Sequence, residues 1–152
     1  MGSYSRWERK TSELDNSSEN HDHITFIFLD TNFLMALSQL TNFNLSYELD
    51  RVIPGNRKLI VLEPIFSELR KLQEQGNPKV QMESRIAIDF VHKFCQKKPS
   101  EYDHRNIDFI LLHYGKERNG IIATNDRKLK RAARKKGIKT LYIRSRRFLE
   151  LQ

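Results

Sequence analysis

The chain has 152 residues and a mass of 18.1 kDa, and with 38% hydrophobic content it is large enough for one globular domain with a substantial core. Its single cysteine, Cys95, excludes an internal disulfide, and no apolar run approaches the roughly 20 residues that a membrane span requires. The formal net charge of +8 and a polar amino end without a signal-peptide pattern predict a cytoplasmic protein with a polyanionic partner.

Charge and periodicity both change near His23. Residues 1–23 hold three basic residues against five acidic ones, a net −2, and show no hydrophobic periodicity, so we expect a flexible polar tail. Residues 24–152, the expected domain, therefore carry +10. Most of this excess lies between Lys116 and Arg147, where thirteen Lys or Arg stand against two acids. A solvated helix face is the ordinary explanation of a charge run, but this density favours contact with a phosphate backbone.

Strands and helices are expected to alternate through the first half of the domain. Ile24–Leu29 is continuously apolar, which is typical of a strand in the centre of a parallel sheet. A helix is expected to open just after Asp30, and a second, short helix covers Leu45–Val52. Lys58–Leu62 is the second predicted strand. Pro64 lies in the first turn of the next helix, which a Gly-Asn-Pro turn ends.

The second half continues the alternation. Val80–Cys95 carries an apolar stripe at helical spacing that includes Phe94, and a polar loop is expected over Lys97–Arg105. The remaining expected elements are a helix over Ile107–Tyr114, a strand over Ile121–Thr124, a basic helix over Asp126–Lys136 and a strand over Thr140–Ile143. Strands that alternate with helices predict an α/β fold with a central, mainly parallel sheet.

Four carboxylates occupy positions that are unusual for an acid. They are Asp30, Glu68, Asp108 and Asp126. Asp30 closes the first apolar strand and Asp126 follows the third, and ligands of open α/β sheets bind beyond the carboxyl ends of the strands. Glu68 and Asp108 have apolar neighbours at helical spacing, which directs both side chains towards the core. We therefore expect the four acids to converge in one pocket, where a cation must compensate their charge.

Clustered carboxylates predict a hard divalent cation. Two unit charges about 4 Å apart repel by about 4 kcal/mol at an effective dielectric near 20. Oxygen ligands without Cys or His favour Mg²⁺ or Mn²⁺, which also bind phosphate oxygens. One or two such ions would activate a water for in-line displacement at phosphorus. An acidic pocket beside a basic rim therefore predicts phosphodiester hydrolysis.

Each acid also has an ordinary structural interpretation. Asp30 and Asp126 are well placed to cap the helices that follow them. Glu68 could pair with a neighbouring cation on its helix, and Asp108 could simply favour the positive end of its own helix. Coincidence at all four positions is the weaker explanation, so the set predicts a site. The histidines, by contrast, share no spacing that suggests one; they include His92, His104 and His113.

Short motifs around the four acids resemble the PIN-domain nuclease family. They are Asp30-Thr31-Asn32, Ser67-Glu68-Leu69, Asp108 at the head of a helix, and Thr124-Asn125-Asp126. Each string is common, but the four in this order and at this spacing are specific, and the resemblance spans roughly Ile24 to Leu151. The basic end of the chain is most similar to the archaeal and eukaryotic group linked to small-subunit rRNA maturation. VapC toxin ribonucleases are the next most similar group.

The resemblance implies a Rossmann-like, three-layer fold with helices on both faces of the sheet. It also implies Mg²⁺- or Mn²⁺-dependent endonuclease action on single-stranded RNA or pre-rRNA, and frequent homodimerisation. A ribosome-assembly particle or, for a toxin, an antitoxin would be the protein partner. The alternative of another class is a ribosome-assembly factor that binds RNA without cleaving it.

Residue roles follow from the resemblance by position. Asp30, Asp108 and Asp126 would be metal ligands, and Glu68 would bind metal or orient the attacking water. The supporting residues would be Thr31, Asn32, Thr124 and Asn125. The basic stretch supplies the expected RNA contacts, which are Arg127, Lys128, Lys130, Arg131, Arg134, Lys135, Arg144, Arg146 and Arg147. Many family members have paired acids where Ile107 precedes Asp108 here, so the number of ions stays open and Asp103 is a candidate substitute.

Overall fold

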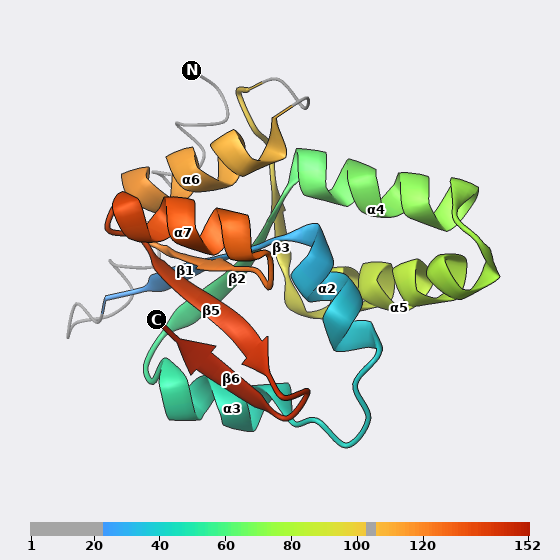
Figure 1. Ribbon diagram of the computed structural model, residues 1–152, viewed down its shortest axis with the longest axis horizontal. Helices are drawn as coiled ribbons and strands as arrows, with labels where there is room; N and C mark the ends of the chain where they lie inside the picture. Colours follow the sequence, from blue (N-terminus) through green and yellow to red (C-terminus); the bar gives the residue numbers. More distant parts are fainter. Residues whose placement is uncertain (1–22, 103–105) are drawn as a thin grey trace.

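A six-stranded sheet forms the centre of the structure (Figure 1), in the strand order β3-β2-β1-β4-β5-β6. The strands are β1 (Thr25–Leu29), β2 (Arg57–Leu62), β3 (Gln96–Lys98), β4 (Ile121–Ala123), β5 (Lys139–Arg144) and β6 (Phe148–Leu151). The first five are parallel to their neighbours, and β6 pairs antiparallel with β5. The predicted α/β fold with a mainly parallel sheet is therefore confirmed.

The computed structural model describes residues 23–102 and 106–152. The predicted tail, apart from His23, and Asp103 lie outside the described residues. No helix in the described part of the chain combines the length and the apolar character needed to cross a membrane.

In the described part of the chain, six helices accompany the sheet. They are α2 (Thr31–Ser38), α3 (Leu45–Val52), α4 (Glu63–Gln75), α5 (Pro78–Phe94), α6 (Ile107–Glu117) and α7 (Arg127–Lys135). Three of them begin at an asparagine whose side chain accepts a backbone N–H of the first turn: Asn44 for α3, Asn77 for α5 and Asn106 for α6. Pro64 lies in the first turn of α4, as predicted.

Helices cover both faces of the sheet. Ile27 and Phe28 are neighbours on β1, so their side chains point to opposite faces, and both are fully buried. Phe28 contacts the ring of Tyr114 on α6, with ring centroids 6.3 Å apart. On the same helix, a Cβ added at Gly115 would lie 3.1 Å from Ile122 of β4, so α6 lies directly on the sheet. This close packing fixes where α6 begins, which matters for the site below.

Two short strands depart from the sequence prediction. β3 (Gln96–Lys98) overlaps the start of the expected polar loop, and β6 (Phe148–Leu151) was not predicted at all. Both lie at the edges of the sheet, where short strands and lysines discourage pairing with another chain and leave little hydrophobic pattern. Phe94 was expected on the buried stripe of α5, but it is the last residue of that helix and its exposed fraction is 64%.

Candidate active site

The four acids singled out in the sequence line one hollow of about 510 Å³, here called the acidic hollow. Asp30 follows the last residue of β1, and Asp126 is the third residue after β4. Glu68 comes from α4 and Asp108 from the first turn of α6. Because β1 and β4 are adjacent parallel strands, their carboxyl ends deliver these side chains to the same edge of the sheet.

Asp30 is the most deeply buried of the four. Its backbone N–H donates to Ala123 of β4 at 2.9 Å, and its residue is only 6% exposed. One carboxylate oxygen, Oδ1, accepts from the backbone N–H of Thr31 at 2.8 Å. The other, Oδ2, accepts from the Thr124 hydroxyl at 2.7 Å. Burial raises the pKa of Asp30 to about 6, and the negative charges of Asp108 and Glu68 add to this, while the two hydrogen bonds act in the opposite direction.

A small hydrogen-bond network supports the Asp30 side chain. The Thr124 hydroxyl also lies 3.2 Å from Asn32 Oδ1 and accepts from the backbone N–H of Asp126 at 3.1 Å. Asn32 Oδ1 in turn accepts from the backbone N–H of Asn125 at 3.0 Å. The Asn125 side chain exchanges two hydrogen bonds with the backbone of Ile143 on β5. Three of the four expected supporting residues therefore join the strand-end acids and β5 in one set of contacts.

The fourth supporting residue, Thr31, is placed differently. Its backbone N–H donates to Asp30 Oδ1, but its hydroxyl oxygen is buried and has no hydrogen-bond partner among the residues that the structure describes. Thr31 also lines the acidic hollow. The hydroxyl therefore makes no visible contribution to holding the acids.

Three helices begin at the acidic hollow. Asp30 is the N-cap of α2, Asp126 is the N-cap of α7, and Asp108 lies in the first turn of α6. The Asp126 side chain accepts from the backbone N–H groups of Lys128 and Leu129, both through Oδ1. The capping interpretation of Asp30 and Asp126 is thus correct, and it coexists with their place in the hollow. The positive ends of three helix dipoles stabilise the acids and would equally attract a phosphate.

The acids are close enough to feel one another's charge. The pKa of Asp108 is raised, first by partial burial and then by the charge of Asp126, with a smaller contribution from Glu68 and with Lys128 opposing. Within the described residues, however, no three acidic, His or Cys side chains stand close enough to form a ready-made metal cluster. The acids surround the hollow without meeting in it.

The chemistry of the donors fits a hard cation. Every ionisable side chain around the hollow is a carboxylate, and amide and hydroxyl oxygens lie beside them. Oxygen donors of this kind are the ligands that Mg²⁺ and Mn²⁺ prefer. Asp30, Glu68, Asp108 and Asp126 are therefore the residues that could hold such an ion.

Part of the hollow was not anticipated from the sequence. Met35 of α2 and Gln39, the C-cap of that helix, line it together with Asn32, and Leu72 of α4 lies on the Glu68 side. Asn32, Met35 and Gln39 are spaced three and four residues apart, as on one face of a helix. Once Asn32 is predicted to belong to the site, this face of α2 can be predicted to line it as well. Ile107, which stands where many PIN sequences have an acid, also lines the hollow.

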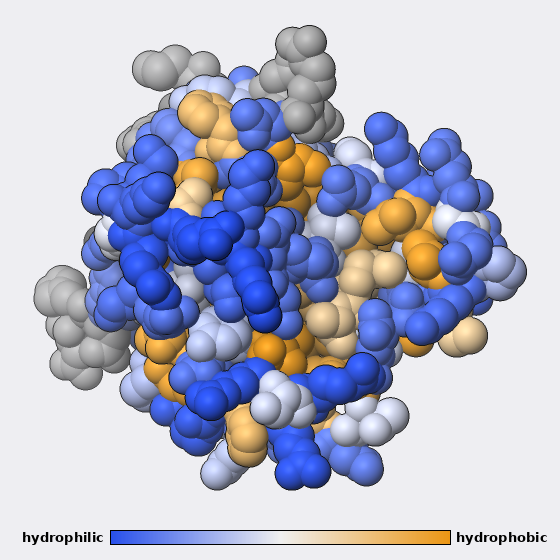
Figure 2. All heavy atoms as spheres, in the orientation of Figure 1, coloured by the Kyte–Doolittle hydropathy of each residue, from blue (hydrophilic) through white to orange (hydrophobic). Residues whose placement is uncertain are grey.

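Cations gather next to the hollow along α7. Figure 2 shows strongly hydrophilic side chains over α7 and around the tip of the β5–β6 hairpin. We call this surface the basic face; its residues are Arg127, Lys128, Lys130, Arg131, Arg134, Lys135, Arg144, Arg146 and Arg147. All of them are exposed except Lys130, which is half-buried because its Nζ lies 3.7 Å from the centroid of the Tyr142 ring.

The hairpin end of the basic face has a defined shape. Ser145 and Arg146 both have positive φ, 54° and 57°, and Arg147 N–H closes the turn on Arg144 O at 3.1 Å. Two consecutive positive φ values are typical of a two-residue hairpin turn, in which Gly or Asn is usual. Arg144 also forms an ion pair with Glu150 across the hairpin at 3.2 Å. Of the three predicted RNA-binding arginines here, Arg144 is thus partly neutralised.

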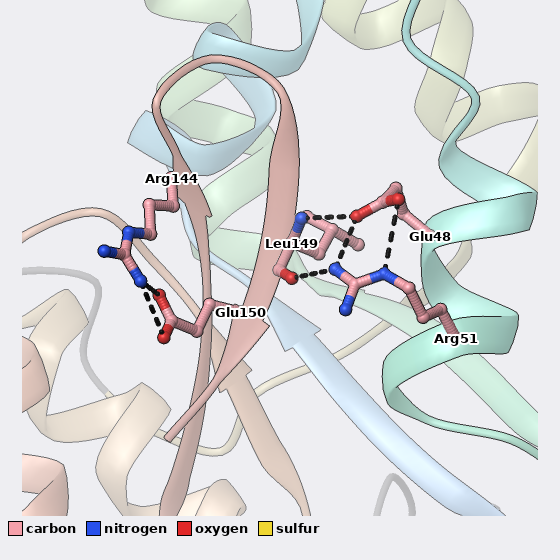
Figure 3. A network of polar contacts seen from close by, with 5 residues as sticks. All are labelled: Glu48, Arg51, Arg144, Leu149 and Glu150. Carbon is pink, nitrogen blue, oxygen red and sulfur yellow. Dashed lines mark hydrogen bonds and ion pairs between the residues drawn. The ribbon is translucent and has the colours of Figure 1, made fainter.

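The outer edge of the hairpin is anchored to α3 (Figure 3). Glu48 Oε1 accepts from the backbone N–H of Leu149 at 2.8 Å, and Arg51 Nη2 donates to the Leu149 carbonyl at 2.7 Å. Arg51 also pairs with Glu48 at 2.8 Å. The two side chains therefore satisfy the backbone of an edge strand that would otherwise be open to another chain.

Comparisons with known proteins agree with this geometry. A family model described as a PIN like domain matches residues 27–146. Ribonuclease VapC4 of Methanocaldococcus jannaschii is 29% identical over 124 residues, which cover 80% of this chain and 92% of that protein.

Two solved structures share the fold. The PIN domain endonuclease Utp24 matches with a TM-score of 0.65 and 22% identity, over 84% of this chain and 90% of that one. A domain of a functionally unknown protein from Methanocaldococcus jannaschii matches with a TM-score of 0.54 and 18% identity, over 80% and 92% of the two chains. The resemblance found in the sequence is confirmed. Because the family model spans most of the chain and includes all four acids, this protein belongs to the PIN-like domain family of nucleases.

Proposed function

We propose that this protein is a Mg²⁺- or Mn²⁺-dependent endoribonuclease whose active site is the acidic hollow. The observation that carries the proposal is Asp30, a buried carboxylate whose pKa is raised to about 6. A fold does not retain such a group for stability, because its ionised form is penalised by burial and by neighbouring acids. A cation bound between Asp30 and the other acids would remove that penalty.

Each acid has a distinct role in this proposal. Asp30, Asp108 and Asp126 hold the metal, and Glu68, which comes from a different helix, either completes its shell or orients the attacking water. When bound, a divalent ion supplies an activated water and a positive charge beside the scissile phosphate. The Thr124 hydroxyl keeps Asp30 Oδ2 oriented, and the backbone of α7 does the same for Asp126 Oδ1.

Helix ends and cations bring the substrate to these acids. The first turns of α2, α6 and α7 direct positive dipole ends at the hollow, which favours a phosphate there. The basic face begins at Arg127, the residue after Asp126, so a strand bound along it would reach the hollow. We propose single-stranded RNA as the substrate, because a flexible strand can bend to bring one phosphate into a hollow at which three helices begin.

The target RNA separates two forms of the proposal. The likeness to Ribonuclease VapC4 extends over nearly all of that protein and supports a toxin-like ribonuclease. The likeness to the Utp24 endonuclease structure and the basic carboxyl end support a processing enzyme of ribosomal RNA. Expression in a heterologous host distinguishes them, because a toxin arrests growth and a processing enzyme does not.

Cleavage in the presence and absence of metal tests the proposal. The full chain is incubated with a 5′-labelled single-stranded RNA and with a structured pre-rRNA fragment in Mn²⁺, Mg²⁺ or EDTA. We expect internal cuts with either ion and none with EDTA. Asp30→Asn should lower the cleavage rate by roughly a thousandfold, because the amide keeps the size of the side chain and one accepting oxygen but loses the charge.

Asp89→Asn is the matched control, since Asp89 is an exposed acid on α5. It should cleave like the wild type. If wild-type protein binds RNA but yields no product with either ion, the catalytic proposal is wrong and the RNA-binding assembly factor takes its place.

A further inference from the structure

A second concave surface lies on the other side of α6. The α6–α7 groove has a volume of about 560 Å³ and is lined by Phe109, Leu112, His113, Lys116, Lys135 and Lys136. Among these, only Lys135 belongs to the basic face. The groove therefore combines aromatic rings with several lysines, and the acidic hollow does not use it.

The aromatic side of the groove is held in place without a ligand. The rings of Phe109 and His113 are nearly parallel, with 22° between their planes and 6.1 Å between their centroids. Tyr102 packs edge-on against both, at 5.4 Å and 4.6 Å, and its hydroxyl lies 3.1 Å from His113 Nε2. Even so, Phe109 is 48% exposed. A fixed ring that faces water is what a stacking platform for an unpaired base requires.

The opposite side of the groove carries positive charge. Lys116 Nζ donates to the backbone carbonyl of Lys136 at 2.9 Å, which holds the lysine across the groove. Lys135 and Lys136 are exposed at the end of α7. The single acid of the groove, Glu117, has Oε2 only 3.3 Å from His113 Nε2. Three lysines against one acid leave the rim suited to a phosphate backbone.

The groove starts beside the acidic hollow along α6. Asp108 lines the hollow, and the next residue, Phe109, lines the groove. Both α6 and α7 begin at the hollow, pack on each other and run side by side (Figure 1). At about 1.5 Å per residue, Lys116 lies roughly 12 Å along α6 from Asp108. A strand in the groove would therefore present the phosphate next to its bound nucleotide to the acids.

We propose that the α6–α7 groove is a nucleotide subsite of the nuclease. An unpaired base stacks on Phe109 and His113, and the lysines hold the adjoining phosphates. The inference rests on the proposed endoribonuclease function and deepens it, because it makes a single-stranded, splayed nucleotide beside the cut a requirement of the substrate. A duplex cannot offer its base faces to the rings, so it is excluded from the groove.

A fluorescent base reports on this subsite directly. Single-stranded RNAs that carry 2-aminopurine at successive positions are bound to full-length Asp30→Asn protein, in which cleavage is suppressed. We expect quenching at one position, loss of that quenching when Phe109→Ala is added, and its recovery with Phe109→Trp. Phe109→Ala in the otherwise wild-type enzyme should raise KM about tenfold with little change in kcat, because stacking acts on binding.

Phe94→Ala is the matched control, because Phe94 is also an exposed phenylalanine but lies at the far end of α5. It should leave quenching and KM unchanged. The double change Lys135→Ala with Lys136→Ala should lower the slope of log affinity against log salt by about 1.4, the value for two phosphates of a single strand.

The outcomes separate the subsite from the nuclease function. If wild-type protein cuts RNA and Phe109→Ala alters neither quenching nor KM, the subsite is wrong and the nuclease stands. If no RNA is cut but the Phe109-dependent quenching appears, the subsite stands and the nuclease function is wrong. A groove used by a protein partner instead would give equal quenching in both phenylalanine variants, which overturns the subsite.

Discussion

The acidic hollow and the basic face are adjacent, meeting between Asp126 and Arg127, yet they are built in different ways. In the hollow, both oxygens of Asp30 are engaged, and Asp126 is fixed by two backbone N–H groups. On the basic face most cations extend into water, and only a few, such as Lys130 over Tyr142, have a fixed position. Binding a small ion requires ligands in a defined geometry, whereas attracting a polyanion requires mainly a high density of positive charge.

This contrast predicts two patterns of response to mutation. Substitutions in the hollow should have large effects on activity or stability, because each removes contacts made by single atoms. Changes on the basic face should be graded, should depend on salt, and should be tolerated when the charge is kept. The following three experiments examine the contrast from its strongest expected effect to its weakest.

The burial of Asp30 should make the metal-free protein less stable at neutral pH. Its pKa is about 6 in the folded chain, against 3.8 for an ordinary aspartate. Between these values the folded protein holds a proton that the unfolded chain has lost, so the free energy of unfolding falls as pH rises through that window. The loss attributable to Asp30 should approach about 3 kcal/mol by pH 7.

Urea unfolding in EDTA at pH 4 and pH 7 measures this loss. Asp30→Asn lacks the titrating group, so its stability should change less between the two pH values than that of the wild type. The difference between the two proteins isolates Asp30 from the other acids. If both proteins lose the same stability between pH 4 and pH 7, the ionised form of Asp30 is not destabilised by burial. The contrast between the hollow and the basic face would then lose its main support.

The Thr124 hydroxyl should matter more than its size suggests. Thr124→Val removes the hydrogen bonds to Asp30 Oδ2 and from the Asp126 backbone at almost constant volume. A hydrogen bond to a charged group is worth about 2 kcal/mol, so cleavage at saturating Mn²⁺ should slow by roughly 30-fold. Thr124→Ser keeps the hydroxyl and should retain most of the rate. A valine variant as fast as the serine variant would show that the network does not position the acids.

The basic face should respond gradually. Replacing Arg127, Arg131 and Arg134 together with alanine should weaken RNA binding by about tenfold at moderate salt and lower the salt slope by about 2. Replacing the same residues with lysine should change affinity little. The matched control exchanges Lys79, Arg85 and Lys93 on α5 for alanine. Equal losses from both triple variants would indicate a response to net charge alone, and no defined basic face.

Much of the fold could be predicted because its signals are local. The buried strands β1, β2 and β4 read as apolar runs, since both faces of a central parallel strand are covered. Asp30, Pro64 and Asp126 marked the beginnings of α2, α4 and α7. β3 and β6 escaped prediction because each is very short and lies at an edge of the sheet, and β6 depends on contacts from Glu48 and Arg51 that are distant in sequence. Edge strands carry no hydrophobic period that a sequence pattern can detect.

The candidate site was predictable in its charged members and not in its surroundings. Asp30, Glu68, Asp108 and Asp126 were conspicuous because an acid beside an apolar run needs a reason. The proposed role of Phe109 and His113 was not visible, because an exposed aromatic and a lone histidine have no distinctive pattern until the end of α7 is placed beside them. The Thr31 hydroxyl, for which the described residues offer no hydrogen-bond partner, could likewise be recognised only in the packed structure.

The order of residues by itself determined the alternation of strands and helices, the positions of the four acids and the density of cations that follows the last of them. Only the tertiary structure decided that the four acids surround one hollow without forming a closed cluster. It also decided that the Thr124 hydroxyl donates to Asp30 and that a groove lies between α6 and the end of α7. Local pattern is fixed by hydrophobicity and backbone preference within a few residues. Distances between side chains that are tens of residues apart are set instead by how helices pack on a sheet, and no short stretch of sequence records that.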